Sequence, residues 1–213
     1  MTLAKRWSRQ DDFDASVEQA SASYNVPVAL IKAVIGVESG FNPSAINKND
    51  PGYAWGLMQM IPTTARALGF VGDMGALLTN TGLAINLGAM LLRQNLSRTG
   101  GAVADSVSAY NGGFRPSLGL GAVRADGTYA NQAYVDRVLD TLAYFNAYAA
   151  SKVPATMGPL PPPLEVGTGL EPLPFRPGSG SNSPGRRPTW ALPLAGIVGG
   201  GLLWLLIYLG LLR

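Results

Sequence analysis

The 213-residue sequence contains no histidine and no cysteine. These absences exclude a Ser-His-Asp triad, a Cys-His nucleophile, a thiolate zinc site and an HExxH metal-binding helix. They also exclude disulfide bonds, so cysteine usage gives no indication of the redox compartment. Carboxylate, tyrosine, serine, threonine and lysine side chains remain available for catalysis, and carboxylates are the usual catalytic groups for glycosidic bonds.

Glutamate is also scarce, with only four in the chain. Glu165 and Glu171 lie in a proline-rich tract that cannot form a packed site, and Glu18 lies in a stretch of ordinary amphipathic spacing. Glu38 instead ends the apolar run VALIKAVIGVESG. Because partial desolvation favours the protonated form of a carboxyl group, Glu38 is our candidate general acid. The ordinary alternative is a helix-end carboxylate paired with a lysine or an arginine.

The charge balance is mildly basic, with 16 Lys and Arg against 13 Asp and Glu. No run of basic residues accompanies it, so we do not predict nucleic-acid binding. A weak positive bias suits an anionic surface such as a bacterial wall or a membrane.

Composition divides the chain into three segments. Residues 1–152 are predicted to form a compact, mainly helical domain, and residues 153–188 a linker rich in proline, glycine and serine. Residues 189–213 are predicted to form a transmembrane helix, because residues 190–212 carry no charge. As a helix, this uncharged run is about 35 Å long, enough for a bilayer core of roughly 30 Å.

The signals for membrane topology place the soluble domain in the cytoplasm of a cell. The N-terminal sequence MTLAKRWSRQDD has no apolar core, so no signal peptide is predicted. Arg186 and Arg187 precede the apolar run, and only Arg213 follows it.

Apolar periodicity predicts an all-α domain with a loop-rich cleft and, at most, one small hairpin. We expect helices over 12–24, 27–39, from Pro62, 81–97, 102–110 and 130–150. Residues 41–54 are expected to be a loop, and 114–128 a loop that can hold the small hairpin. In the second helix one stripe carries four apolar residues and the candidate acid, which is therefore expected at the rim of the core: Leu30, Ile31, Val34, Ile35 and Glu38.

Four short motifs follow one another along this domain: ESGFNP (38–43), AWGLMQMIP (54–62), AYNGG (109–113) and AYVDRVL (133–139). INLGAMLL (85–92) lies between the second and the third. Together, over about residues 20–148, they resemble the catalytic domain of the soluble lytic transglycosylases, a lysozyme-like fold related to goose-type lysozyme.

The resemblance implies a substrate and a mechanism. The substrate is the β-1,4 bond between MurNAc and GlcNAc in peptidoglycan. Glu38 would protonate the glycosidic oxygen and then, as a carboxylate, accept the proton of the muramyl 6-hydroxyl, leaving a 1,6-anhydro sugar. No second catalytic carboxylate, metal or cofactor is implied.

The resemblance also assigns supporting roles near the start of the cleft. Ser39 and Gln59 would lie beside the acid and orient the substrate, and Met58 would line the cleft floor. Considered without the resemblance, core packing is the favoured interpretation of Met58. Gln59 is favoured as functional because a polar amide within GLMQMI needs a partner.

Three further residues come from the later motifs. Tyr110 and Asn111 would shape the sugar site, with Asn111 hydrogen-bonding the saccharide. Tyr134 resembles the tyrosine whose hydroxyl reaches the catalytic carboxyl group. Core packing is an equal alternative for Tyr110 and Tyr134. The glycines after Asn111 are interpreted as residues that end the helix.

Two departures from the family pattern are visible. The loop INKNDPGYAW is longer than the shortest family versions and contains Asp50, and the third motif reads AYNGG where AYNAG is common. If Asp50 faces the cleft it could activate water, which would make the protein a hydrolytic muramidase. The ordinary alternative is a solvent-exposed turn residue before Pro51.

The combination of a wall-cutting domain, a membrane span and no export signal suits a virion. We therefore expect a bacteriophage component in a virion membrane that opens the host wall while the genome enters the cell. Its partners would be glycan strands, the bilayer through residues 190–212, and other virion or envelope-complex proteins. The alternatives are a bacterial inner-membrane protein that faces the periplasm, acting in conjugation or secretion, and an inactive wall-binding membrane protein.

Overall fold

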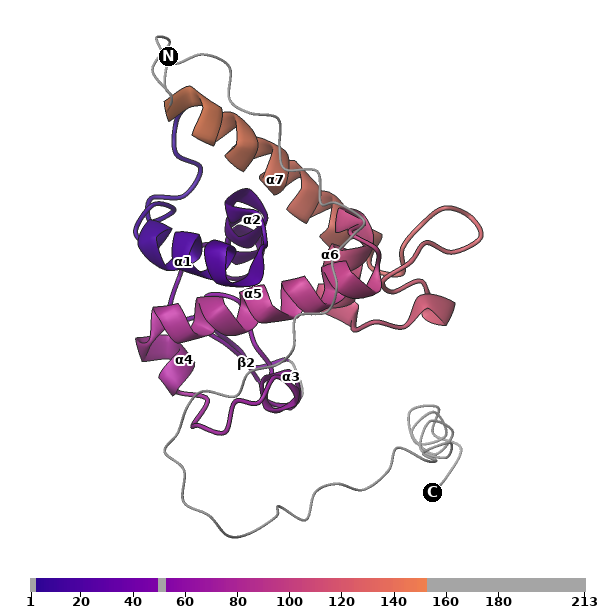
Figure 1. Ribbon diagram of the computed structural model, residues 1–213, viewed down its shortest axis with the longest axis horizontal. Helices are drawn as coiled ribbons and strands as arrows, with labels where there is room; N and C mark the ends of the chain where they lie inside the picture. The colour runs from indigo at the N-terminus through magenta and orange to yellow at the C-terminus, as the bar shows by residue number, and fades with distance from the viewer. Residues whose placement is uncertain (1–2, 50–52, 153–213) are drawn as a thin grey trace, which may run out of the picture. The chain divides into compact units, whose positions relative to one another are not determined.

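The computed structural model describes residues 3–49 and 53–152 (Figure 1). Among these residues, no helix is both long and apolar enough to cross a bilayer. The predicted linker (153–188) and transmembrane helix (189–213) lie outside the described residues, as does Asp50.

The described chain is mostly helical, with one two-residue antiparallel hairpin in which Ile46 pairs with Trp55. The elements in chain order are α1 (Asp14–Tyr24), α2 (Val28–Ser39), β1 (Ile46–Asn47), β2 (Ala54–Trp55), α3 (Pro62–Ala67), α4 (Ala76–Thr79), α5 (Thr81–Arg98), α6 (Val103–Gly112), a 3-10 turn (Pro116–Leu118) and α7 (Gln132–Lys152).

Helix α2 is the central element and contacts α1, α5 and α7. Every residue from Leu30 to Gly36 is buried, including Lys32. The predicted single apolar stripe was therefore too narrow, because neighbouring helices cover α2 on several sides. Glu38 is half-buried in the last turn, where the helix leaves the core. Gly40 then ends the helix in the left-handed conformation (φ 59°), which glycine adopts without a steric penalty.

Helix α5 separates two apolar clusters. Its inner face, which includes Ile85, Ala89 and Leu92, joins the main core with α1, α2 and α7. Its outer face, which includes Ala84 and Leu87, packs on a smaller cluster under α3 and α4. Figure 1 shows α5 crossing the domain with α1 and α2 on one side and α3 and α4 on the other. This arrangement holds the connection from β2 to α3 against the rest of the domain.

The structure differs from the sequence predictions in three places. The hairpin forms within 46–55, in the region expected to be a loop, whereas 114–128 holds the 3-10 turn and one isolated bridge between Arg115 and Leu120. The short helix α4 was not predicted, because four residues carry no readable period. Helix α6 continues through Gly112, where an added Cβ would lie 2.4 Å from Leu120 Cδ2. Gly112 is therefore required for close packing, whereas Gly113, with a φ of 75°, ends the helix as predicted but two residues later.

A cluster of charges joins the N-terminal segment to α2 and α7. The Asp11 carboxylate lies 3.0 Å from Lys5 Nζ and 3.3 Å from the Nζ atoms of Lys32 and Lys152, and it accepts a 2.8 Å hydrogen bond from the Tyr148 hydroxyl. Partial burial alone would raise the pKa of Asp11. The hydrogen bonds from Tyr148, Lys5 and Lys32 outweigh burial and hold that pKa well below its ordinary value.

Asp11→Asn is therefore expected to lower the free energy of unfolding by about 2 kcal/mol near pH 7. Because the folded-state pKa is depressed, the contribution of Asp11 is fully present above its unfolded pKa of about 3.9. It is lost as the pH falls below that value toward the folded pKa. Urea unfolding of the wild type and the variant at pH 7 and pH 3 measures both effects.

Asp12→Asn is the matched control, since the Arg9–Asp12 pair has both side chains about half exposed. An exposed pair of this kind contributes at most about 1 kcal/mol. A loss at Asp11 that equals the loss at Asp12, or that does not shrink at pH 3, would contradict the assignment.

Candidate active site

An open cleft of about 1340 Å³ runs past the end of α2. Its walls come from the last residues of α2, the segments 42–47 and 59–61, helix α3, the C-terminal half of α5, the end of α6 with the residues that follow, and α7. Six of the seven predicted site residues line the cleft: Glu38, Ser39, Gln59, Tyr110, Asn111 and Tyr134. The fold thus brings together side chains from widely separated motifs.

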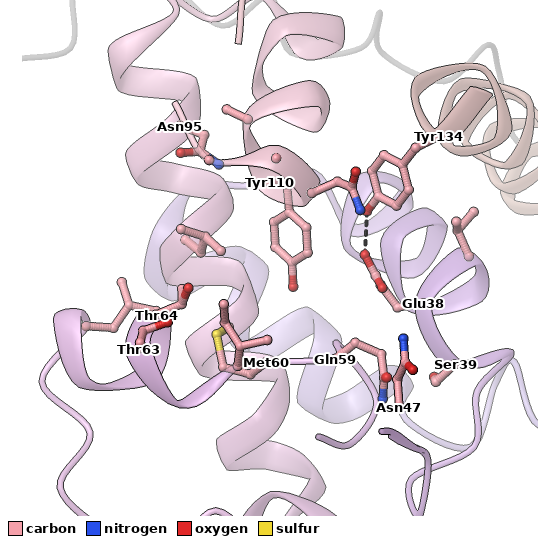
Figure 2. Close-up of a pocket in the computed structure, with 18 of the residues that line it drawn as sticks. Glu38, Ser39, Asn47, Gln59, Met60, Thr63, Thr64, Asn95, Tyr110 and Tyr134 are labelled. Carbon is pink, nitrogen blue, oxygen red and sulfur yellow. Dashed lines mark hydrogen bonds between the residues drawn. The ribbon is translucent and has the colours of Figure 1, made fainter. Parts of the chain in front are cut away.

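The Glu38 carboxyl group is held by Tyr134 of α7. The Tyr134 hydroxyl donates a 2.6 Å hydrogen bond to Glu38 Oε1, as the dashed line in Figure 2 marks. Burial, and then the negative charge of Glu38, raise the pKa of Tyr134 well above its ordinary value of 10. Tyr134 therefore stays protonated across the physiological range and acts toward Glu38 as a donor.

Tyr110, near the end of α6, is held by a hydrogen bond to the main chain. Its hydroxyl donates a 2.8 Å hydrogen bond to the carbonyl oxygen of Met58. Burial, and to a smaller extent the Glu38 charge, raise the pKa of Tyr110 well above 10. Its hydroxyl proton is thus committed to the loop that carries Gln59.

Met58 does not line the cleft, which corrects the prediction that it forms the cleft floor. Its side chain is fully buried in the main core. It packs directly on Gly88 of α5, where an added Cβ would lie 2.1 Å from Met58 Sδ. Met60, two residues further on, lines the cleft instead (Figure 2).

Gln59 has a strained backbone and a fixed side chain. Its φ of 45° lies in the left-handed region, which is uncommon for a residue other than glycine. Its Nε2 donates to the carbonyl oxygens of Gly56 (2.8 Å) and Ala45 (3.2 Å). Both amide hydrogens are thereby used, so the group that Gln59 can offer to a ligand is the acceptor oxygen Oε1.

Ser39 ties the end of α2 to the following loop. Its hydroxyl lies 2.8 Å from the carbonyl oxygen of Leu57 and 3.2 Å from that of Ile35. A serine has one hydroxyl hydrogen, so its donor capacity is taken by the main chain and only its oxygen lone pairs can meet a ligand.

The cleft also contains residues that the sequence motifs did not indicate. Figure 2 shows Asn47, Thr63, Thr64 and Asn95 among its walls. On α5, the positions 91, 94, 95 and 98 all line it, and this spacing of three and four residues marks one helix face. The same helical period runs through the INLGAMLL motif, and it was the signal in the sequence from which this cleft-lining face of α5 could have been predicted. Arg115 and Arg137 add positive charge at the rim.

Among the described residues that line the cleft, Glu38 is the only one with a carboxyl group. Among residues 3–49 and 53–152 there is no group of three or more His, Cys, Asp or Glu side chains that could hold a metal ion.

The sequence model of the Transglycosylase SLT domain family matches residues 15–129. Protein IpgF of Shigella flexneri is 34% identical over 103 residues, covering 46% of this chain and 66% of that protein. The transglycosylase of Enterobacteria phage PRD1 is 37% identical over 98 residues, covering 46% of this chain and 34% of that protein. This chain thus spans less than two thirds of the length of either relative.

Solved structures agree with the fold. The 70 kDa soluble lytic transglycosylase of Escherichia coli superposes with a TM-score of 0.54 at 25% identity, covering 64% of this chain and 24% of that one. The lytic transglycosylase Slt of Pseudomonas aeruginosa gives a TM-score of 0.53 at 21% identity, covering 68% and 25%. Because the family match spans more than half of the 213 residues and the helical fold agrees with it, the chain belongs to the Transglycosylase SLT domain family.

Proposed function

We propose that this protein is a peptidoglycan lytic transglycosylase that cleaves the MurNAc–GlcNAc β-1,4 bond without consuming water. The observation that carries the proposal is the half-buried Glu38 carboxyl group, which lines an open cleft and accepts a hydrogen bond from the protonated hydroxyl of Tyr134. Membership of the family and the phage relative named a transglycosylase support it.

In the first step Glu38 acts as general acid. Since Tyr134 donates to Oε1, the acid proton is carried by Oε2 and is transferred to the glycosidic oxygen as the C1–O bond breaks. The leaving GlcNAc hydroxyl keeps that proton, and positive charge develops at C1 of the muramyl ring. The hydrogen bond from Tyr134 then stabilises the carboxylate that forms.

In the second step the same carboxylate acts as general base. It accepts the proton of the muramyl 6-hydroxyl while the oxygen of that group bonds to C1, which closes the 1,6-anhydro ring. Glu38 is then protonated again, ready for another cycle, and the atoms balance without water. A single carboxyl group is sufficient for this route, whereas most glycoside hydrolases use two.

Mass spectrometry of the fragments that the full chain releases from purified sacculi tests the proposal. We expect muropeptides that end in 1,6-anhydroMurNAc. Reducing ends, heavier by one water, would instead identify a muramidase and direct attention to Asp50. Absence of any released fragment, from protein shown to be folded, would favour a wall-binding role.

We also propose that residues 189–213 anchor the enzyme in a membrane and that residues 153–188 tether the domain to it. The support is the run at 190–212 without a charged residue and the ten prolines of the preceding segment. We place the protein in a phage virion membrane, with the phage relative as support.

Flotation of the full chain with lipid vesicles, beside a chain that stops at residue 188, tests the anchor. We expect the full chain to float and the shortened chain to stay with the soluble fraction. Detection in purified virions would support the location in a phage. Recovery only from host envelope fractions would contradict it and favour a conjugation or secretion role.

A further inference from the structure

Asn131 joins two helices that line the cleft. It lies directly before α7, which carries Tyr134, and its side chain reaches the end of α6. Asn131 Oδ1 accepts a 2.8 Å hydrogen bond from Ser108 Oγ. Asn131 Nδ2 donates to the Ser108 carbonyl oxygen and to Asn111 Oδ1, both at 3.0 Å. The side-chain amide of Asn131 is therefore the link between the core of α6 and the cleft residue Asn111.

The direction of each hydrogen bond in this network follows from backbone groups that can only donate or can only accept. The backbone N–H of Gly121 can only donate, and it donates to Ser108 Oγ at 3.1 Å. The single hydroxyl hydrogen of Ser108 is thus left for Asn131 Oδ1. The backbone carbonyl of Ser108 can only accept, so the atom of Asn131 that faces it is Nδ2. The second hydrogen of Nδ2 then faces Asn111, whose side-chain oxygen must accept it.

This arrangement of donors and acceptors fixes the orientation of the Asn111 side-chain amide. With Oδ1 held by Asn131, the NH2 group of Asn111 is turned away from Asn131, on an exposed residue that lines the cleft. We propose that Asn131 is a positioning residue that makes Asn111 a hydrogen-bond donor toward the glycan, and that the glycan atom bound there is an acceptor oxygen. The inference rests on the proposed glycan-cleaving function.

Gln59 provides the opposite polarity in the same cleft. Both hydrogens of its amide are bound by the carbonyl oxygens of Ala45 and Gly56, so Gln59 offers an acceptor. The fold therefore holds two chemically similar amides in opposite senses, a donor at Asn111 and an acceptor at Gln59. A saccharide that fits both must present an oxygen acceptor to the first and a hydroxyl or amide N–H to the second.

Asn131→Asp tests the inference, because a carboxylate can only accept. It would accept the Asn111 NH2 group and so turn the Asn111 oxygen toward the glycan. With kcat/KM measured on soluble glycan strands, we expect about a tenfold loss from Asn131→Asp alone. In an Asn111→Ala background, the same substitution should change kcat/KM by less than about twofold, because the residue through which Asn131 acts is already absent.

Two further variants separate positioning from loss of structure. In the Asn131→Ala variant the Asn111 amide can rotate, but nothing forces its oxygen toward the glycan. The loss of kcat/KM in Asn131→Ala should therefore be smaller than in Asn131→Asp. Asn86→Asp also removes an Asn-to-carbonyl hydrogen bond, to Gly82 in the first half of α5, and should leave kcat/KM unchanged.

Equal losses from Asn131→Asp in both backgrounds would overturn the inference while leaving the proposed function intact. A larger loss from Asn131→Ala than from Asn131→Asp would do the same. Failure of the wild-type chain to cleave glycan at all would overturn the proposed function and, with it, this inference.

Discussion

Replacing Glu38 by glutamine is expected to lower the rate of glycan cleavage by about a thousandfold. The glutamine side chain has nearly the same shape, and its carbonyl oxygen can still accept the hydrogen bond that Tyr134 donates to Oε1. It cannot give up a proton to the glycosidic oxygen or take one from the 6-hydroxyl. Both proposed steps therefore fail while the cleft keeps its form. The initial rate of fragment release from sacculi measures the effect.

Glu18→Gln is the matched control for this substitution. Glu18 is exposed on α1, which contributes no residue to the cleft, so its replacement should leave the rate unchanged. The thermal unfolding midpoint of Glu38→Gln should stay close to that of the wild type. A Glu38→Gln variant that keeps more than about a tenth of the wild-type rate would remove Glu38 from the catalytic role.

Tyr134→Phe is expected to lower kcat by about 10- to 100-fold, because a hydrogen bond to a charged group contributes roughly 1.5–3 kcal/mol. In the proposed mechanism this hydrogen bond is strongest once Glu38 has become a carboxylate, so its loss falls on kcat more than on KM. The steady-state rate on soluble glycan strands separates the two parameters.

The same variant should change the pH dependence of the reaction. In the proposed mechanism, wild-type activity is expected to fall on the alkaline side, where the general acid loses its proton. Removing a donor that stabilises the carboxylate should move this alkaline limb to higher pH. Tyr134 itself does not titrate there, since its pKa is raised well above 10.

Tyr24→Phe, on α1 outside the cleft, is the control for losing a tyrosine hydroxyl. It should leave both kcat and the pH profile unchanged. If Tyr134→Phe keeps the wild-type kcat and profile, the role of Tyr134 is limited to packing.

Local patterns in the sequence were sufficient for the longer helices and for the half-buried position of Glu38 near the end of α2. Apolar spacing located α2, α5 and α7 to within a few residues, because long amphipathic segments carry a readable period. The expected burial of α2 on one stripe was wrong, since the number of neighbours that cover a helix is a tertiary property. The hairpin at 46–55 escaped prediction because two-residue strands show no alternation.

The arrangement of the site was harder to predict from the sequence than the helices were. Met58 and Met60 lie in the same motif and both are buried, Met58 in the main core against Gly88 and Met60 in the smaller cluster, where it also lines the cleft. The link from Asn131 to Asn111 spans two helices and depends on donor and acceptor directions. No spacing rule encodes such directions. The hydrogen bond between Tyr134 and Glu38 was expected from family resemblance alone, because 96 positions separate the two residues.

Under the proposed mechanism, the packing of α2 against α7 also determines when a newly made chain can become active. While the ribosome has completed α2 but not α7, the face of α2 that packs on α7 is uncovered and Tyr134 does not yet exist. At roughly 5–20 residues per second, the 96 positions between the two side chains correspond to a delay of about 5–20 s. During that interval the nascent chain carries its acid without a working site. The face of α2 that α7 later covers is then the surface on which we expect chaperones to act.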